Sequence, residues 1–146
     1  MYRERIRANP WWMKGEISAP RYDCVLVENN PNLPGLEGLL VGQLRLLYSI
    51  EHEGIEYPCA LVDWFQRDGD TRDKVTGMWK LRPRMVRGVR HRSVIHLDCV
   101  LRGAHLLPVF GEGFVPRKLN YTATLNVFRA FYLNHNIDHH AFEVLR

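Results

Sequence analysis

The most chemically distinctive segment of the sequence is the basic run 80–93, KLRPRMVRGVRHRS, which contains no acidic residue. The whole chain has a formal charge of +4, so the remainder of the chain without the six Lys and Arg side chains of this run carries −2. Local positive charge attracts polyanions such as nucleic acid, although such clusters are also common on solvated loops. The candidate phosphate-binding residues are Lys80, Arg82, Arg84, Arg87, Arg90 and Arg92.

The basic run lacks the features of an element that reads bases. Pro83 and Gly88 interrupt it, so a continuous helix for the major groove of DNA is not expected. Its apolar residues are too few to bury it, and we expect an exposed, mobile hairpin loop. Mobile arginines neutralise phosphates without a fixed register on bases, so binding to nucleic acid should be weak, sequence-independent and steeply salt-dependent. The alternative is a solvated loop without a nucleic-acid partner.

Four aromatic residues near the second expected hairpin form another candidate site. They are Tyr57, Trp64, Phe65 and Trp79. Small β-barrels can hold a methylated lysine in a cage of such rings through cation–π attraction. Bulky aromatic side chains also dominate the cores of small domains, so ordinary core packing is the alternative.

Histidines in the second half of the chain raise the question of a metal site. His96 and Asp98 share one face of an expected strand, and three further histidines follow. These are His105, His139 and His140. Such a set could bind zinc or serve an enzyme, but its spacing matches no ligand signature. We therefore expect hydrogen-bonded structural histidines and no bound metal.

The common signatures of enzyme chemistry are missing from the sequence. There is no GxSxG nucleophile elbow, no P-loop and no GxGxxG fingerprint. Asp68, Asp70 and Asp73 crowd one loop, but an EF-hand that began at Asp68 would need glycine and glutamate where Asp73 and Trp79 stand. We therefore expect neither an enzyme nor a cofactor.

The cysteines and the apolar segments indicate a reducing compartment. Cys24, Cys59 and Cys99 are odd in number and far apart, with no CxxC spacing, and their apolar neighbours predict buried free thiols. The N-terminus has no apolar core of signal-peptide length, and no stretch approaches the ~20 apolar residues of a membrane span. We expect a nuclear or, alternatively, cytoplasmic protein without a membrane partner, and the sequence leaves its oligomeric state open.

Alternation of apolar and polar residues predicts a set of short strands. Leu44, Leu46, Tyr48 and Ile50 share one parity, which is typical of a half-buried strand. HEGIE, residues 52–56, is a hairpin turn in which Gly54 can take a positive φ. The expected strands cover 22–27, 39–50, 56–65, 78–81 and 94–100.

The pattern becomes helical towards the C-terminus. Leu125, Phe128 and Tyr132 follow i, i+3 and i+7 spacing, which predicts one amphipathic helix at about 122–134, with Thr122 as N-cap, packed across the sheet.

The expected fold class is mainly β (α+β): a small twisted antiparallel sheet or a partly open barrel with one C-terminal helix. The expected division is an N-terminal extension at 1–20, a β domain at 21–116 and a helix and tail at 117–146.

Several stretches taken in order resemble a known group of proteins. They are GLLVGQLRLLYSI, YPCALVDWF, TGMWKLRP and VIHLDCVLRGAHLLPVFG. Their order is similar to the C-terminal segment of transposase-like proteins of fungal Plavaka and Kyakuja–Dileera–Zisupton transposons, over roughly residues 21 to 116. The motif residues are Val62–Phe65 and Leu101–Phe110 in this chain. The strand order also looks, more loosely, like a bromo-adjacent-homology (BAH) module, a chromatin-associated β fold.

The resemblance implies an accessory domain and not a catalytic one. The nuclease core of such transposases is an RNase-H-like fold with separated acidic metal ligands, and this chain has no counterpart of it. The function implied is a non-catalytic, BAH-like interaction module of transposon origin that binds a chromatin protein or histone tail in the nucleus. Asp63 stands where the family has arginine, so a family role at that position does not carry over.

Overall fold

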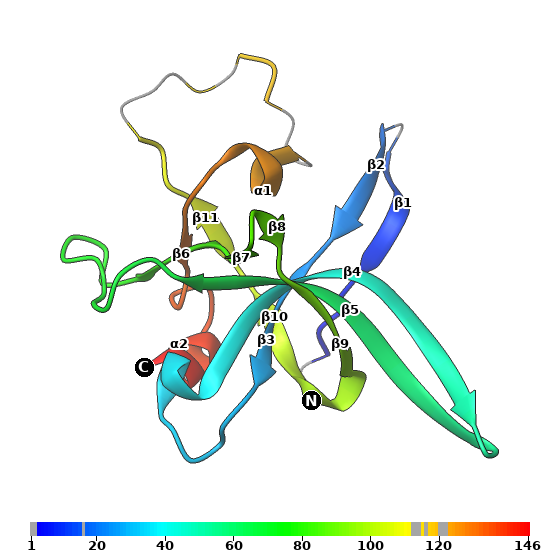
Figure 1. The fold of residues 1–146 in the computed structure, drawn as a ribbon. Coiled ribbons are helices and arrows are strands. Elements are labelled where there is room, and N and C mark those ends of the chain that lie inside the picture. Colours follow the sequence, from blue (N-terminus) through cyan, green and yellow to red (C-terminus); the bar gives the residue numbers. More distant parts are fainter. Residues whose placement is uncertain (1–2, 16, 112–114, 116, 120–122) are drawn as a thin grey trace.

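The structure, a computed structural model, describes residues 3–15, 17–111, 115, 117–119 and 123–146 (Figure 1). Strands dominate it, which confirms the predicted mainly β class. The first strands are β1 (Ala8–Lys14), β2 (Ile17–Tyr22), β3 (Cys24–Glu28), β4 (Leu39–His52) and β5 (Ile55–Arg67). The later strands are β6 (Trp79–Pro83), β7 (Met85–Val86), β8 (Val89–Arg90), β9 (Arg92–His96), β10 (Val100–Ala104), β11 (Leu106–Pro108) and β12 (Phe131–Leu133). The helical segments are the 3-10 turns η1 (Gly35–Gly38) and η2 (Leu97–Cys99) and the helices α1 (Thr124–Val127) and α2 (His139–Leu145).

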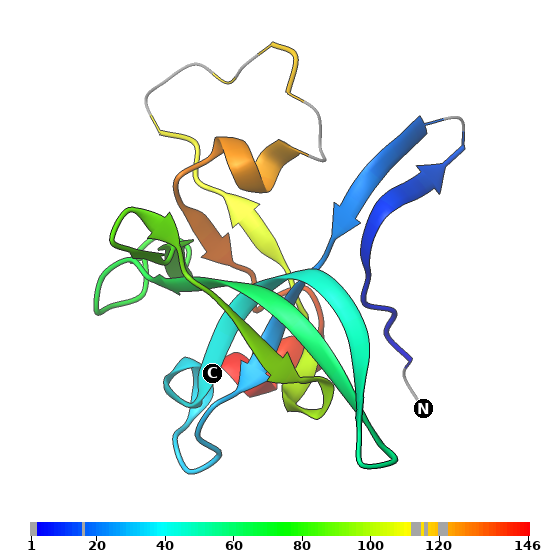
Figure 2. The same ribbon diagram turned by 45° about the vertical axis from the view of Figure 1, so that its right-hand side comes forward.

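The main sheet curls into a nearly closed, antiparallel barrel with one seam (Figure 1 and Figure 2). Its strand order is β10-β3-β4-β5-β6-β12-β11, and β9 pairs with β5 outside this path. β10 and β11 are the two ends of the order, yet only His105 separates them along the chain. The two ends are therefore covalently adjacent, which is why the sheet bends round instead of lying open. Two further pairs, β1 with β2 and β7 with β8, form small separate sheets.

The β4–β5 hairpin is the longest element, and it projects from the barrel (Figure 1). β4 pairs with β5 from Gly42 opposite Trp64 to His52 opposite Ile55. The turn consists of Glu53 (φ 51°) and Gly54 (φ 76°), because a two-residue turn with two positive φ values matches the twist of the strands. The predicted strands and the predicted turn are confirmed here.

Two clusters of buried side chains fill the molecule, and adjacent residues of β5 belong to different clusters. Phe65 lies in a cluster with Leu81 and Phe131, whereas Trp64 lies in a cluster with Val25 and others. Successive side chains of a strand point to opposite faces, so one strand supplies both clusters. Gly42 is required opposite Trp64, because a Cβ there would collide with the side chain of Val62.

The helix predicted at about 122–134 is wrong. α1 ends at Val127, Phe128 is already extended (ψ 148°), and Tyr132 lies in β12 between β6 and β11. Phe131 and Leu133 are almost fully buried on one face of β12. Burial of these alternate residues in a strand prevailed over the helical spacing of Leu125, Phe128 and Tyr132. The N-cap predicted at Thr122 lies outside the described residues.

The C-terminal helix is α2, and a buried arginine attaches it to the barrel. Asp138 caps α2 by accepting a hydrogen bond from the backbone N of Ala141 (2.7 Å). The same carboxylate forms a bidentate pair with Arg102 of β10, at 2.9 and 2.7 Å. The pKa of Asp138 is held well below its usual range, first by the hydrogen bond from Arg102 and then by that from Ala141. The C-terminal residues are therefore packed on the barrel.

The strand predicted at 94–100 is broken. β9 ends at His96, η2 follows, and Val100 begins β10. The Nδ1 of His96 accepts a hydrogen bond from the backbone N of Asp98 (3.2 Å), which caps this turn. Cys99, predicted to be buried, is exposed because the turn points it outward, whereas Cys24 and Cys59 are buried as predicted.

The N-terminal residues predicted as an extension form the β1–β2 hairpin, and side chains attach the segment before it to the barrel. The Oε2 of Glu4 accepts a hydrogen bond from the backbone N of Gly103 (2.9 Å), and the Oδ2 of Asp23 accepts one from that of Arg7 (2.8 Å). None of the helices in the described ranges has the length and apolar character needed to cross a membrane.

Replacing Phe131 by alanine should lower the free energy of unfolding by about 3–5 kcal/mol, because its ring is fully buried where β12 joins the sheet. Phe142→Ala on the exposed side of α2 is the matched control and should cost much less. Urea unfolding followed by circular dichroism measures both. Equal losses would contradict the placement of Phe131.

Iodoacetamide at pH 8 should label Cys99 quickly and Cys24 only after unfolding. Burial, assisted by the charge of Asp23, raises the pKa of Cys24 to about 12, so the reactive thiolate is almost absent from the folded protein. Mass spectrometry of the peptides, in buffer and in urea, follows each thiol separately. Rapid labelling of Cys24 in the absence of urea would show that this part of the barrel is open.

Candidate functional site

The four aromatic residues predicted to form a cage do not come together. Trp64 and Phe65 are 5% and 4% exposed and face opposite sides of β5. The Nε1 of Trp64 donates to the Oγ of Ser93 (2.6 Å), and Phe65 packs edge-on against Phe131 at 5.8 Å between ring centroids. The cage is therefore corrected to core packing for these two rings, which was the stated alternative.

The other two predicted cage residues lie elsewhere. Tyr57 is partly exposed near the far end of the β4–β5 hairpin. Trp79 begins β6 and is half-buried, with the guanidinium carbons of Arg67 and Arg72 at 5.0 and 5.7 Å from its ring centroid. Cation–π attraction is present at Trp79, but the cations are the protein's own arginines.

The basic run is not one loop but parts of four strands, β6 to β9, so the predicted hairpin loop is corrected. Only β7 and β8 make a small hairpin, and its turn contains Arg87 (φ 52°) and Gly88 (φ 77°). β6 and β9 both pair with β5, which fixes the two ends of the run in the barrel. Pro83 and Gly88, the residues that exclude a helix, are compatible with strand ends and turns.

Two arginines of the run already have partners within the protein. Arg92 forms two hydrogen bonds to Asp63, at 2.6 Å from Nε and 3.0 Å from Nη2, and the hydrogen bond and charge of Asp63 raise the pKa of Arg92. Arg90 lies over the ring of Phe65 at 4.5 Å, and its pKa is lowered because it is partly buried. Its Nε and the Nδ1 of His91 are buried with no hydrogen-bond partner among the described residues. The guanidinium groups of Arg90 and Arg92 therefore take part in contacts within the barrel.

The other basic residues of the run differ in whether they have a partner within the protein. Arg82 lies 3.8 Å from Asp68, and Lys80 lies 5.8 Å from the ring of Tyr132. Arg84 and Arg87 are exposed, and no ion pair is formed by either within the described part of the chain. Of the six residues predicted to contact phosphate, Arg84 and Arg87 are therefore the best remaining candidates.

Asp63 is a buried carboxylate that binds arginines of two neighbouring strands. One sign of this role is visible in the sequence: Asp63 is a charged residue on the otherwise apolar face of its strand. It is 6% exposed and receives Arg92 of β9 and, at 3.6 Å, the Nε of Arg45 of β4. The Arg92 side chain is 47% exposed, so only the carboxylate of this pair is buried, and its two hydrogen bonds to Arg92 join β9 to β5. Arg102 had no comparable signal in the sequence, because its partner Asp138 is 36 residues away.

The histidines considered as metal ligands have separate environments. His105 contacts the side-chain amide of Asn134 (3.1 Å), His140 contacts Arg102 (3.1 Å), and His139 pairs with Glu143 (3.1 Å). No group of three or more His, Cys, Asp or Glu side chains in the described ranges is arranged to hold a metal ion.

One face of the β4–β5–β9 sheet is apolar and exposed, although the alternation that includes Leu46 and Ile50 predicted a buried face for their strand. The pairing of Leu46 with Leu61, of Leu61 with Val94 and of Ile50 with Tyr57 places these side chains on one face. Its exposed members are between 37% and 56% exposed, and they are Leu46, Ile50, Ile55, Tyr57 and Val94. Scattered apolar residues are normal on a surface, but a contiguous set marks an interaction site.

The apolar face continues to a free strand edge. The backbone N of Trp64 donates to the carbonyl of His91 (3.0 Å), which fixes the hydrogen-bonding parity of β9 against β5. By this parity, the backbone groups of Arg92, Val94 and His96 point away from β5. Within the described part of the chain β9 pairs with β5 alone, so a row of donors and acceptors borders the apolar face.

Comparison of the chain with protein-family models, with curated proteins and with solved structures found no match in any of the three. The likeness to transposase tails and to BAH modules therefore stays a prediction.

Weak binding of duplex DNA should depend on Arg84 and Arg87 more than on total charge. The Arg84→Ser, Arg87→Ser variant should lower the slope of log affinity against log salt by about two units, since each phosphate contact contributes ~0.9. Arg3→Ser, Arg5→Ser removes the same charge from the exposed N-terminal segment and is the control. Fluorescence anisotropy of a labelled duplex at several salt concentrations measures the slope. Equal slopes for the two variants, or binding insensitive to salt, would exclude this contact surface.

Proposed function

We propose that the protein is a non-catalytic interaction module that binds an extended segment of a partner protein along β9. The observation that carries the proposal is the apolar face of the β4–β5–β9 sheet together with the free edge of β9. An added strand would take its backbone hydrogen bonds from Arg92, Val94 and His96, and its own apolar side chains would lie beside Val94 and extend the apolar face.

The charge at the end of the β4–β5 hairpin favours a partner with a basic end. Glu51 and Glu56 stand directly opposite each other at the end of the hairpin, on the face opposite to that of Ile50 and Tyr57, and Glu53 occupies its turn. Like charges in a cross-strand pair repel, and a cation between them would relieve that repulsion. β9 runs towards this end of the hairpin, so an antiparallel partner strand would present its N-terminal residues there.

The partner class is a basic, apolar-alternating segment, and a chromatin protein with a histone-like tail agrees with that chemistry and with the family resemblance. The proposal does not use the aromatic cage. It places the module in the nucleus as the family resemblance does, with no catalytic step.

The test uses a capped synthetic peptide, Lys-Lys-Thr-Val-Thr-Ile-Thr-Val-Ser, with a second peptide carrying the two lysines at its C-terminal end. The first peptide should bind more tightly. Val94→Pro removes the outward N–H of residue 94 and should weaken binding about tenfold, since it removes a hydrogen bond and adds a steric barrier to pairing. Titration calorimetry and amide chemical shifts of residues 92–96 measure the effect.

Val94→Thr is the matched control, because it keeps the N–H and the branched side-chain shape. It should retain most of the binding. Urea midpoints for both variants show that the barrel still folds, as proline is tolerated on the open edge of a strand. Equal binding by Val94→Pro and wild type, or equal binding of the two peptides, would contradict strand addition in this orientation.

A further inference from the structure

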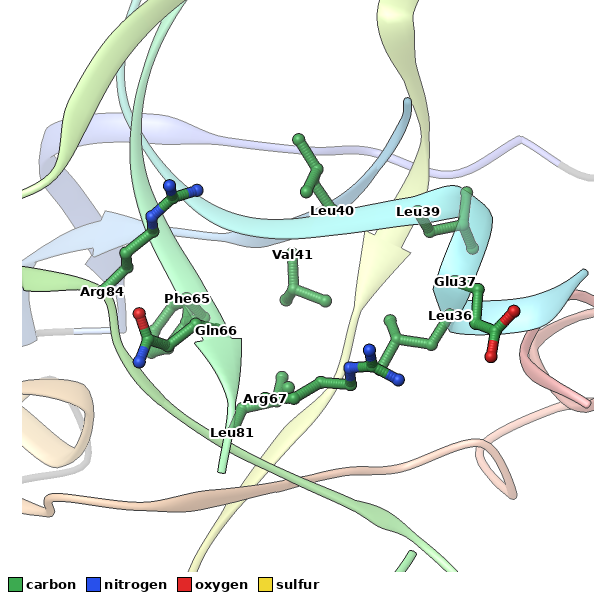
Figure 3. A pocket seen from close by; sticks show the side chains of 10 residues that line it. All are labelled: Leu36, Glu37, Leu39, Leu40, Val41, Phe65, Gln66, Arg67, Leu81 and Arg84. Carbon is green, nitrogen blue, oxygen red and sulfur yellow. The ribbon is translucent and has the colours of Figure 1, made fainter. Parts of the chain in front are cut away.

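A recessed site lies at one end of the barrel, away from the apolar face of the β4–β5–β9 sheet. It is a pocket of about 220 Å³ between η1, the start of β4, the end of β5 and β6 (Figure 3). Its apolar lining includes Leu36, Val41, Phe65 and Leu81, which belong to the same buried cluster, together with Leu39 and Leu40. The pocket is therefore an opening into the barrel core and is formed by residues that packing already holds in place.

Two arginines border this pocket. Figure 3 shows the guanidinium groups of Arg67 and Arg84 on two sides of the opening, with Val41 between them. Neither forms an ion pair with a carboxylate in the part of the chain that the structure describes, and Arg67 is held near the ring of Trp79. Glu37 is the one acidic residue of the lining, so the pocket carries one net positive charge.

We infer that this pocket binds the apolar anchor of an acidic segment of a partner protein, with a phenyl-sized side chain inserted and carboxylates on both sides of it. An apolar cavity of about 150 Å³ holds benzene in another protein, so a pocket of 220 Å³ has room for a phenylalanine ring. Carboxylates that flank the ring would face Arg67 and Arg84, whose planar groups suit bidentate pairing.

This inference goes beyond the proposed function, because it concerns another surface and a segment of the opposite charge. The two sites differ in what they recognise: β9 offers backbone hydrogen bonds to a basic strand, whereas the pocket offers depth and positive charge. A partner with one basic, extended segment and one acidic segment with an aromatic anchor could occupy both.

The probe is a capped, fluorescein-labelled peptide, Gly-Ser-Asp-Glu-Phe-Asp-Glu-Ser-Gly. Two control peptides carry alanine in place of phenylalanine, or amides in place of the four carboxylates. The first peptide should bind, and each control peptide should bind at least about tenfold more weakly. Ring-current shifts of the methyl groups of Val41, Leu81 and Leu36 in NMR spectra should report the inserted ring.

Protein variants separate the pocket from general charge. Arg67→Gln, Arg84→Gln should weaken the first peptide about tenfold, because both guanidinium contacts are lost. Arg84→Gln, Arg87→Gln removes the same charge but only one lining residue, and should weaken it by a smaller factor. Val94→Pro should leave this binding unchanged, which distinguishes failure here from failure of strand addition at β9.

Four results with the peptides and the protein variants would overturn the inference. They are equal binding of the phenylalanine and alanine peptides, equal effects of the two double variants, loss of binding in Val94→Pro, and methyl shifts outside the pocket. A single-stranded oligonucleotide of equal charge is the last comparison. If it shifts the pocket methyls at lower concentration than the peptide does, the site recognises nucleic acid and the assignment to an acidic peptide is wrong.

Discussion

Trp64 is the residue at which β5 exchanges one neighbouring strand for another, and the remaining architecture depends on that exchange. Its backbone N donates to the carbonyl of His91, and its carbonyl accepts from the backbone N of Arg84. The N of His91 in turn donates to the carbonyl of Arg84 (2.8 Å). Buried backbone groups need partners, and here three hydrogen bonds supply them where β9 gives way to β6. These hydrogen bonds join the two residues that flank the β7–β8 hairpin, Arg84 and His91. The hairpin is therefore anchored at its base even though its turn is exposed.

Ion pairs with one buried partner join the outer elements to the barrel, and they explain why a charge count overstated the free positive charge. Asp63 engages Arg92 and Arg45, and Asp138 engages Arg102. Each carboxylate joins parts of the chain that are distant in sequence: β4 and β9 to β5 in the first case, α2 to β10 in the second. Of the arginines in the basic run and at the pocket, Arg67, Arg84 and Arg87 are exposed and form no ion pair within the described residues.

The strands β3, β4 and β5 were predictable because their alternation and their turn residues are local properties, whereas β1 and β2 were expected to be an extension. The strand β12 was not, since Leu125, Phe128 and Tyr132 also fit a helix, and only pairing with β6 and β11 decides between the two. The same limit applies to the site. Alternation shows which residues of a strand share a face, but it does not show whether a face meets a core, a free edge or solvent. Trp64 and Phe65 lie on opposite faces of β5 and both are buried, because both faces meet a core at this point. Leu46 and Ile50 are equally apolar, but they are exposed on a projecting hairpin.

The late position of β12 has a consequence for synthesis on the ribosome. β6 is complete at residue 83, but its second neighbour consists of residues 131–133, so Leu81 and Phe65 lack part of their cover until that segment emerges. Throughout that interval the nascent chain exposes an unpaired strand edge next to apolar side chains, which is the kind of surface that chaperones bind and that aggregates propagate.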